Sequence, residues 1–179
     1  MTITANTSYD PTSHILVVNA REPLLWILQE QRTAFTENPH RPHPLPKRGD
    51  ELFLYATGTA LGSRKEAGRL IGNATAVGDV INLADPVQFD GTAYSQGLDL
   101  RIHGVAPRAK GVIMAGLKDH LEIISNKVNW GPALRSATVA LPRRDADLIR
   151  RDLQPLLESP ESVIDQYRAG QEALELPVV

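Results

Sequence analysis

The stretch that best indicates the fold is Glu51–Thr57, ELFLYAT, which is followed after a short interval by Leu70–Ile81, LIGNATAVGDVI. Both runs are rich in apolar, β-branched and aromatic residues, a composition that is typical of buried strands. Between them lies the basic segment Gly58–Arg69, which contains three glycines. We therefore predict a long hairpin with a basic, glycine-punctuated tip.

On the N-terminal side of this hairpin, Ile15–Val18 is a short apolar run that predicts an opening strand. Apolar residues then recur at helical spacing, so we predict an amphipathic helix over Pro23–Phe35, capped by Glu22 or Asn19. The segment Thr36–Gly49 carries four prolines. Proline lacks the amide hydrogen that helices and central strands need, so this segment is predicted to be a loop.

On the C-terminal side, Leu98–Val105 alternates apolar and polar residues and predicts a half-buried strand. A helix or turn is expected at Lys118–Ile124, and Ala137–Leu141 is short enough for a last barrel strand. Asp145–Leu153 has acids in its first turn and Pro155 beyond its end, which favours a helix. A final helix is expected to begin at Ser159-Pro160 and to pack on the body or on a second copy.

About five to six short strands interleaved with helices favour a small mixed β-barrel of the α/β (α+β) class with helices packed over it. The strict strand-helix alternation of a doubly wound sheet is absent from this pattern. We predict a flexible arm over 1–13, one domain over 14–157 and a C-terminal helical appendage over 158–179.

The composition restricts the class of protein. The chain has 179 residues and is 42% apolar, which is enough for one domain with a real core. It has no cysteine, which excludes disulfides, thiol nucleophiles and cysteine-ligated zinc. The N-terminus has no signal-peptide pattern and no window approaches the roughly 20 apolar residues of a membrane span. We expect a cytoplasmic protein with no membrane partner.

The charge is unevenly distributed along the chain. The net charge is −2, but from Asp152 onward there are six acids and one base, so the rest of the chain is mildly basic. Such a body attracts phosphate groups only weakly through bulk charge, and a solvated surface with an acidic terminal helix would give the same pattern.

Familiar catalytic motifs are missing. The glycines at 58, 62 and 68 match neither a P-loop nor G-x-G-x-x-G, and no nucleophile elbow or H-E-x-x-H occurs. His40 and His43 lack a third ligand at suitable spacing, and His103 and His120 lack a neighbouring nucleophile. We therefore expect no metal and no cofactor.

Two clusters remain as candidate sites. Asn126–Arg135 combines two amides, two cations and Trp130, residue types that stack on a base, read its edge and meet its phosphate. Trp130 plugging one end of the barrel would explain the tryptophan equally well. The second cluster, Tyr55 and Thr57 followed by Arg64 and Lys65, is suited to lining a pocket and holding a phosphate, but a mobile surface hairpin would look the same.

The order of these segments resembles the PUA-like superfamily, and within it the EVE domains more than the ASCH or YTH branches. The resemblance rests on Gly49–Thr57, Gly68–Val77 and Leu134–Pro142, together with Ile15–Asn19 and the helix after it. It implies a PUA-like barrel with a pocket at one end for a modified or flipped nucleobase. The nucleobase contacts that it implies are Asn19, Trp26, Tyr55, Thr57, Asn126, Trp130 and Arg135, and the phosphate-backbone contacts are Arg64, Lys65 and Lys127.

We thus predict a non-enzymatic reader of RNA or DNA that carries a modified, for example methylated, base, with a separate effector protein as a possible further partner. One alternative is a small hydrolase acting on a modified nucleoside through Lys127 with Thr57 or Glu122. Another is a structural or regulatory protein that dimerises through its terminal helices. The chain is expected to be a monomer or a homodimer.

Overall fold

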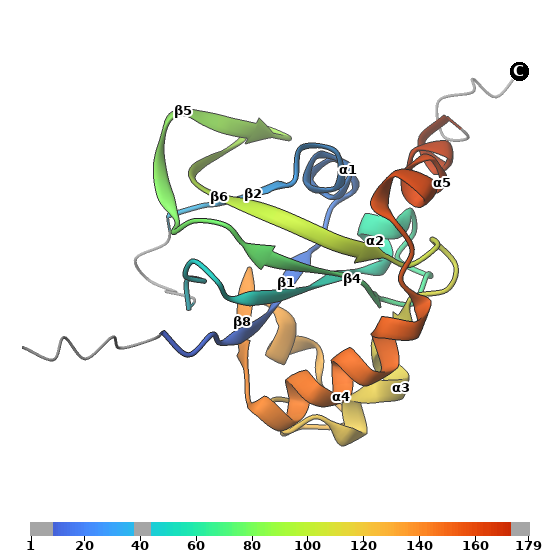
Figure 1. The fold of residues 1–179 in the computed structure, drawn as a ribbon. Helices are drawn as coiled ribbons and strands as arrows, with labels where there is room; N and C mark the ends of the chain where they lie inside the picture. Colours follow the sequence, from blue (N-terminus) through green and yellow to red (C-terminus); the bar gives the residue numbers. More distant parts are fainter. Residues whose placement is uncertain (1–8, 38–43, 173–179) are drawn as a thin grey trace, which may run out of the picture.

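A computed structural model of the chain describes residues 9–37 and 44–172, which fold around one strongly curled sheet (Figure 1). His40 and His43 lie outside the described residues. The strands are β1 (Ser13–Val18), β2 (Arg32–Phe35), β3 (Glu51–Ala56), β4 (Arg69–Ala76), β5 (Ile81–Phe89), β6 (Thr92–Val105), β7 (Val112–Ile113) and β8 (Thr138–Leu141). The helices are α1 (Arg21–Glu30), α2 (Gly58–Leu61), α3 (Met114–Leu117), α4 (Arg143–Leu153) and α5 (Pro160–Glu172), with 3-10 turns η1 (Lys118–His120), η2 (Gly131–Leu134) and η3 (Gln154–Leu156).

The sheet is mixed and curls into a half-barrel (Figure 1). Its strand order is β2-β6-β4-β3-β1-β8, with β5 added on β6 and β7 on β4. The pair β1–β3 is parallel and the other pairs are antiparallel. The mixed α+β class with helices packed over a curled sheet is as predicted; the predicted small β-barrel takes the form of a half-barrel.

Strand β3 separates two apolar cores because successive side chains of a strand point to opposite faces. Leu52 and Leu54 face the core under α1 and α5, whereas Phe53 and Tyr55 face the core under α3 and α4. Figure 1 shows α1 and α5 on one side of the central strands and α3 and α4 on the other. The apolar run ELFLYA is thus buried on both faces, which explains why it reads as continuous rather than alternating.

The predicted helix Pro23–Phe35 is wrong in its second half. Helix α1 ends at Glu30, because the next residue, Gln31, adopts a left-handed conformation (φ 50°). The Gln31 amide makes the last hydrogen bond of the helix, to the Ile27 carbonyl. Residues Arg32–Phe35 then pair with β6 as strand β2. Thr33 and Phe35 are buried at the two-residue spacing of a strand, so tertiary pairing overrides the helical spacing of the apolar residues. The residue before the helix is Ala20, which gives no side-chain cap, so neither predicted cap residue is used.

The hairpin of β5 and β6 extends the sheet beyond what the pattern predicted. β6 begins at Thr92, earlier than the predicted Leu98. β5 was not predicted as a strand, because its residues are mostly exposed and Pro86 interrupts the run. The turn is Asp90-Gly91, in which both residues have positive φ, the geometry of the tight turns that join antiparallel strands.

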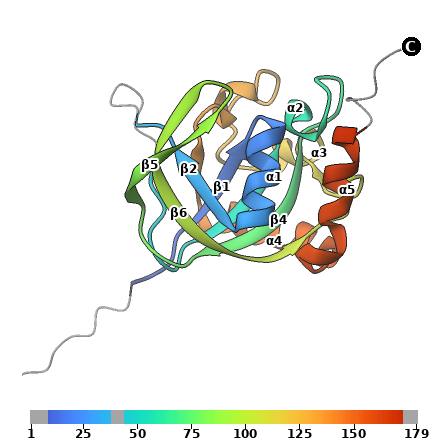
Figure 2. The same ribbon diagram turned by 90° about the horizontal axis from the view of Figure 1, so that it is seen from above.

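The C-terminal helix α5 begins at Pro160, as expected, and lies beside α1 (Figure 2). Its Val163 and Tyr167 are buried in the core that α1 covers. Within the described part of the chain, each helix is too short or too polar to cross a lipid bilayer.

Candidate nucleobase pocket

The curled sheet leaves a hollow of about 320 Å³ at the seam between its two ends. Strand β2 forms one edge of the sheet, and β1 with β8 forms the other. We call this hollow the seam pocket. It is lined by Leu16–Val18 of β1, Thr33–Phe35 of β2, Tyr94 of β6, Pro23 and Ile27 of α1, and Asn19, Thr36 and Arg135–Ala137.

Two of the predicted base contacts meet in this pocket. Asn19 follows β1 and Arg135 follows η2, and both side chains are exposed. They lie more than a hundred residues apart in the chain, and they are brought together because the backbone amide of Val17 donates to the Ala137 carbonyl beside β8. The pocket therefore has an amide and a guanidinium among its lining groups.

Two aromatic residues are in the lining of the seam pocket, and neither was among the predicted base contacts. Phe35 is buried, whereas the half-buried Tyr94 forms the accessible aromatic wall. Its ring packs edge-to-face on Phe89, with ring centroids 5.3 Å apart, and Phe89 packs in the same way on Trp26 at 5.5 Å. Trp26 thus supports the wall through Phe89. Tyr94 follows the Asp90-Gly91 turn by three residues, and that dipeptide is the sequence signal that could have revealed it.

Thr33 adds a polar side chain to the lining. It is only 3% exposed, yet it lines the pocket from β2. A hydroxyl offers both a donor and an acceptor to a ligand that enters the pocket.

Tyr55 and Thr57 have structural contacts elsewhere. Tyr55 is 5% exposed, and its hydroxyl lies 2.2 Å from the position that a Cβ would take at Gly68, so only glycine fits there. Burial raises the pKa of the Tyr55 hydroxyl. The Thr57 hydroxyl accepts from the Ala60 amide and caps α2.

The cluster Asn126–Arg135 is divided by the fold. Trp130 is half-buried against the core under α3 and α4. This packing agrees with the alternative interpretation, in which the tryptophan fills one end of the barrel. Oδ1 of Asn126 accepts from the amides of Val128 and Asn129 and fixes the local turn. Within the described residues, the pocket lining includes Arg135 but neither of these two side chains.

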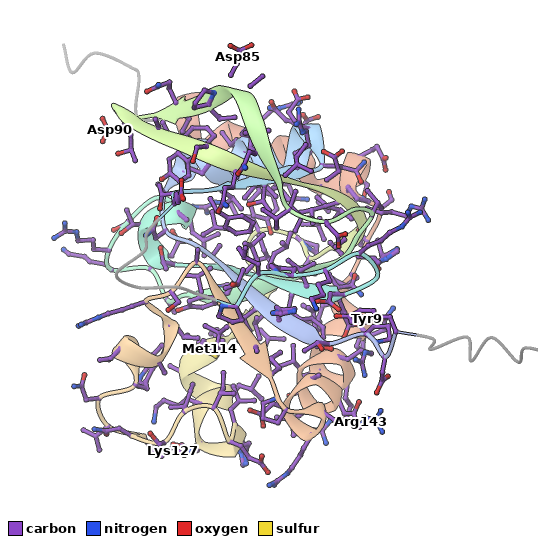
Figure 3. All side chains as sticks on the ribbon, turned by 90° about the vertical axis from the view of Figure 1, so that its left-hand side faces the viewer. Tyr9, Asp85, Asp90, Met114, Lys127 and Arg143 are labelled. Atoms are coloured by element: carbon purple, nitrogen blue, oxygen red, sulfur yellow. The ribbon has the colours of Figure 1, made fainter. Side chains whose placement is uncertain are left out.

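The side chain of Lys127 is bound to backbone carbonyls a few residues earlier in the chain. Its Nζ donates to the carbonyls of Leu121 (2.6 Å) and Lys118 (3.1 Å), and Nζ of Lys118 donates back to the Lys127 carbonyl (2.7 Å). Figure 3 places Lys127 at the opposite end of the molecule from Asp90 and the turn before Tyr94. Arg64 and Lys65 are exposed between α2 and β4.

The catalytic alternative combined Lys127 with Thr57 or Glu122. Each of these groups already has a partner, since Thr57 caps α2 and Oε1 of Glu122 pairs with Arg144 at 3.2 Å. Within residues 9–37 and 44–172, the structure contains no group of three or more His, Cys, Asp or Glu residues that could hold a metal ion.

Comparison with solved structures identifies the fold. An ASCH protein from Zymomonas mobilis superposes with a TM-score of 0.50 and 16% identity, covering 84% of this chain and 99% of that one. The fold is PUA-like. Rpa0253 from Rhodopseudomonas palustris gives the same TM-score and identity, covering 81% of this chain and 94% of that one.

The DUF55 domain of human thymocyte nuclear protein 1 is also similar, with a TM-score of 0.45, 14% identity, and coverage of 79% of this chain and 98% of that one. No protein-family model and no curated protein matches the sequence. The predicted PUA-like fold is confirmed, whereas membership of the superfamily and the narrower resemblance to EVE domains stay predictions.

Proposed function

We propose that this protein binds RNA or DNA and accommodates one modified or flipped nucleobase in the seam pocket. The observation that carries the proposal is the pocket itself, a hollow at the open seam of a PUA-like sheet with an aromatic wall and an amide and a guanidinium in its lining. In this proposal Tyr94, rather than the predicted Trp130, stacks on the base, and Asn19 and Arg135 remain base contacts as predicted.

The size of the seam pocket favours a single heterocycle. Its volume of about 320 Å³ is near the lower end of ligand pockets, which span about 300 to 1,000 Å³. A duplex cannot enter such a space. A base that is unstacked, flipped or already single-stranded can, and extrusion from a duplex costs a few kcal/mol.

The lining supplies the contacts that base recognition uses. Tyr94 offers a ring for stacking, an interaction worth about 1 to 3 kcal/mol per base. Asn19 can donate to and accept from a base edge, and Arg135 can meet the adjoining phosphate or a carbonyl of the base. Thr33 adds a hydroxyl from the opposite edge strand.

The test is a titration of the full chain with single-stranded oligonucleotides that differ only in one modified cytosine or adenine. We expect tighter binding to one modified strand than to its unmodified form. Tyr94→Ala and Asn19→Ala should remove that difference. Asn82→Ala, which removes an exposed amide on β5, is the matched control for Asn19.

Arg135→Ala should weaken binding, whereas Arg143→Ala on the distant helix α4 should not. Equal affinity for every modified and unmodified strand, unchanged by Tyr94→Ala, would refute the proposal. We further propose, as in the sequence analysis, that the protein acts in the cytoplasm without catalysis, as a monomer or homodimer, and that a separate effector acts on the bound nucleic acid.

A further inference from the structure

We infer that two loops next to the α1 N-terminus form a second contact surface, which binds the sugar-phosphate backbone of the nucleic acid. The loops are residues 62–69, from the end of α2 to the first residue of β4, and residues 106–111, between β6 and β7; we call them the paired basic loops. The inference rests on the proposed function and deepens it, because it adds the path of the backbone outside the seam pocket.

The paired basic loops concentrate positive charge. They contain Arg64, Lys65, Arg69, Arg108 and Lys110 but only one acid, Glu66. The side chains of Arg64, Lys65 and Lys110 are exposed and have no ion pair within the described residues. On a chain with a net charge of −2, this is a local excess rather than a general basicity.

Hydrogen bonds from Arg69 and Arg108 hold the two loops next to each other. Nη1 of Arg69 donates to the carbonyls of Ala109 and Gly111, both at 3.1 Å. Nη2 of Arg108 donates in the other direction, to the Leu61 carbonyl and to Oε2 of Glu66 at 3.1 Å. In Figure 1 the loop that follows β6 lies beside α2 and α5. The cations of both loops therefore belong to one surface.

A further cation, Arg21 of α1, lies against this surface. A Cβ at Gly62 would lie 3.2 Å from Nη2 of Arg108 and 3.5 Å from Nη1 of Arg21, so the two guanidinium groups meet above this glycine. Burial and, next, the positive charge of Arg108 lower the pKa of Arg21. Glu66 is the carboxylate between them, and it leaves an excess of positive charge that an anion would relieve.

Two of the arginines also have unused donors. Nε of Arg21 and Nε of Arg69 are buried from solvent and have no hydrogen-bond partner within the described residues. Because both atoms are enclosed by protein, a phosphate is met by the exposed side chains of Arg64, Lys65 and Lys110 rather than by these donors.

The surface continues from the seam pocket. Asn19 lines the pocket and Arg21 follows it by two residues. The backbone amide of Thr57, where α2 begins, donates to the Val18 carbonyl at the end of β1 (3.0 Å). A strand whose base occupies the pocket therefore leaves it next to the basic surface.

Phosphate fits this surface better than a carboxylate-bearing peptide. The exposed guanidinium of Arg64 can bind two phosphate oxygens at once, and the flexible Lys65 and Lys110 add point charges that tolerate any sequence. Arg69 and Arg108 hold the loops together and add positive charge beneath them. Contacts to the backbone position a nucleic acid without reading its bases. The base in the pocket then supplies the specificity.

The experiment separates this surface from the pocket by using a single-stranded oligonucleotide in which every base is replaced by an abasic linker. We expect the full chain to bind it in low salt. The triple variant Arg64→Ala, Lys65→Ala, Lys110→Ala should reduce the slope of log affinity against log salt by about 2, at about 0.7 per lost contact. Tyr94→Ala should leave this binding unchanged.

The matched control removes three exposed cations elsewhere, Arg48→Ala, Arg143→Ala and Arg144→Ala, and should preserve the slope. An equal effect of both triple variants, or no binding of the abasic strand, overturns the inference. Equal affinity for poly-glutamate overturns the assignment to phosphate. If the abasic strand binds through the loops while modified bases make no difference, the loop surface stands and the base-pocket proposal fails.

Discussion

Nε2 of the buried His14 lies 2.9 Å from Oδ2 of Asp50, which is itself only 1% exposed. The same carboxylate accepts from the Tyr9 hydroxyl (2.6 Å) and from the amides of Thr12 (2.9 Å) and Lys47 (2.8 Å). Asp50 thereby joins the chain that precedes β1 to the start of β3. One side chain fixes the parallel register of the two central strands at the end opposite the seam pocket.

Asp50→Ala should lower the free energy of unfolding by about 3 kcal/mol, because it leaves several buried donors without an acceptor. Urea denaturation at neutral pH measures this change. Asp85→Ala, which removes an exposed carboxylate on β5 (Figure 3), is the control and should change stability by less than about 0.5 kcal/mol. Equal effects of the two substitutions would show that the four contacts do not stabilise the fold.

Stability should also fall in acid through Asp50. Burial alone would raise the pKa of this carboxyl, but the hydrogen bonds from Tyr9, Lys47, Thr12 and His14 outweigh burial and hold the pKa below its usual value. The stabilisation is therefore present above the unfolded-state pKa of about 3.9 and is lost as the pH falls through the lower, folded-state pKa. Urea midpoints measured below pH 5 should decrease less steeply for Asp50→Asn than for the natural chain; parallel curves would contradict this assignment.

Arg150→Lys should lower stability by about 1 kcal/mol. Arg150 joins α4 to β3 through two hydrogen bonds to Glu51, from Nε (3.1 Å) and Nη2 (2.5 Å), and lysine keeps the charge but not the paired donors. The pair is partly exposed, so solvent screening limits its contribution. Arg151→Lys, on an exposed arginine of the same helix, should be nearly neutral in the same urea titration. A neutral Arg150→Lys would mean that charge alone matters.

Gly58→Ala should lower stability by about 2 kcal/mol, since the new Cβ would lie 2.1 Å from the Glu66 carbonyl oxygen and 2.7 Å from that of Ser63. Gly116→Ala is the control, because nothing lies within 4 Å of its Cβ position in α3. Alanine favours helices, so that variant should gain up to about 1 kcal/mol. Thermal melts of both proteins give the comparison, and a tolerated alanine at position 58 would contradict the close packing at the start of α2.

The elements that local pattern predicted well are those whose burial is visible in their own residues. The run ELFLYAT became β3, and the predicted strand Ala137–Leu141 became β8, because both are apolar enough to be buried. The predicted run Leu70–Ile81 became β4 only as far as Ala76, and its last residue, Ile81, begins β5. Residues Arg32–Phe35 were mistaken for helix because their strand conformation depends on pairing with β6, more than sixty residues away. Strand β5 is mostly exposed although most of its residues are apolar, and it contains Pro86, so neither an alternating pattern nor a continuous run marks it as a strand.

The candidate site divides in the same way. Asn19 and Arg135 were found from residue type and order, and both line the seam pocket. Trp130 was chosen for its aromatic ring, but an indole packs a core as readily as it stacks on a base, and here it packs on the core under α3 and α4. Tyr94 was missed because its position in the wall comes from β6 lying across the seam.

The sequence by itself determined the mixed α+β class, the burial of β3 and the basic character of the segment after α2, because these follow from the chemistry of neighbouring residues. The tertiary structure alone decided where the sheet stays open, which ring lines the opening and which loops lie beside it. The reason is that a pocket forms between elements distant in the chain, and its shape depends on the pairing and curl of the whole sheet rather than on any segment of it.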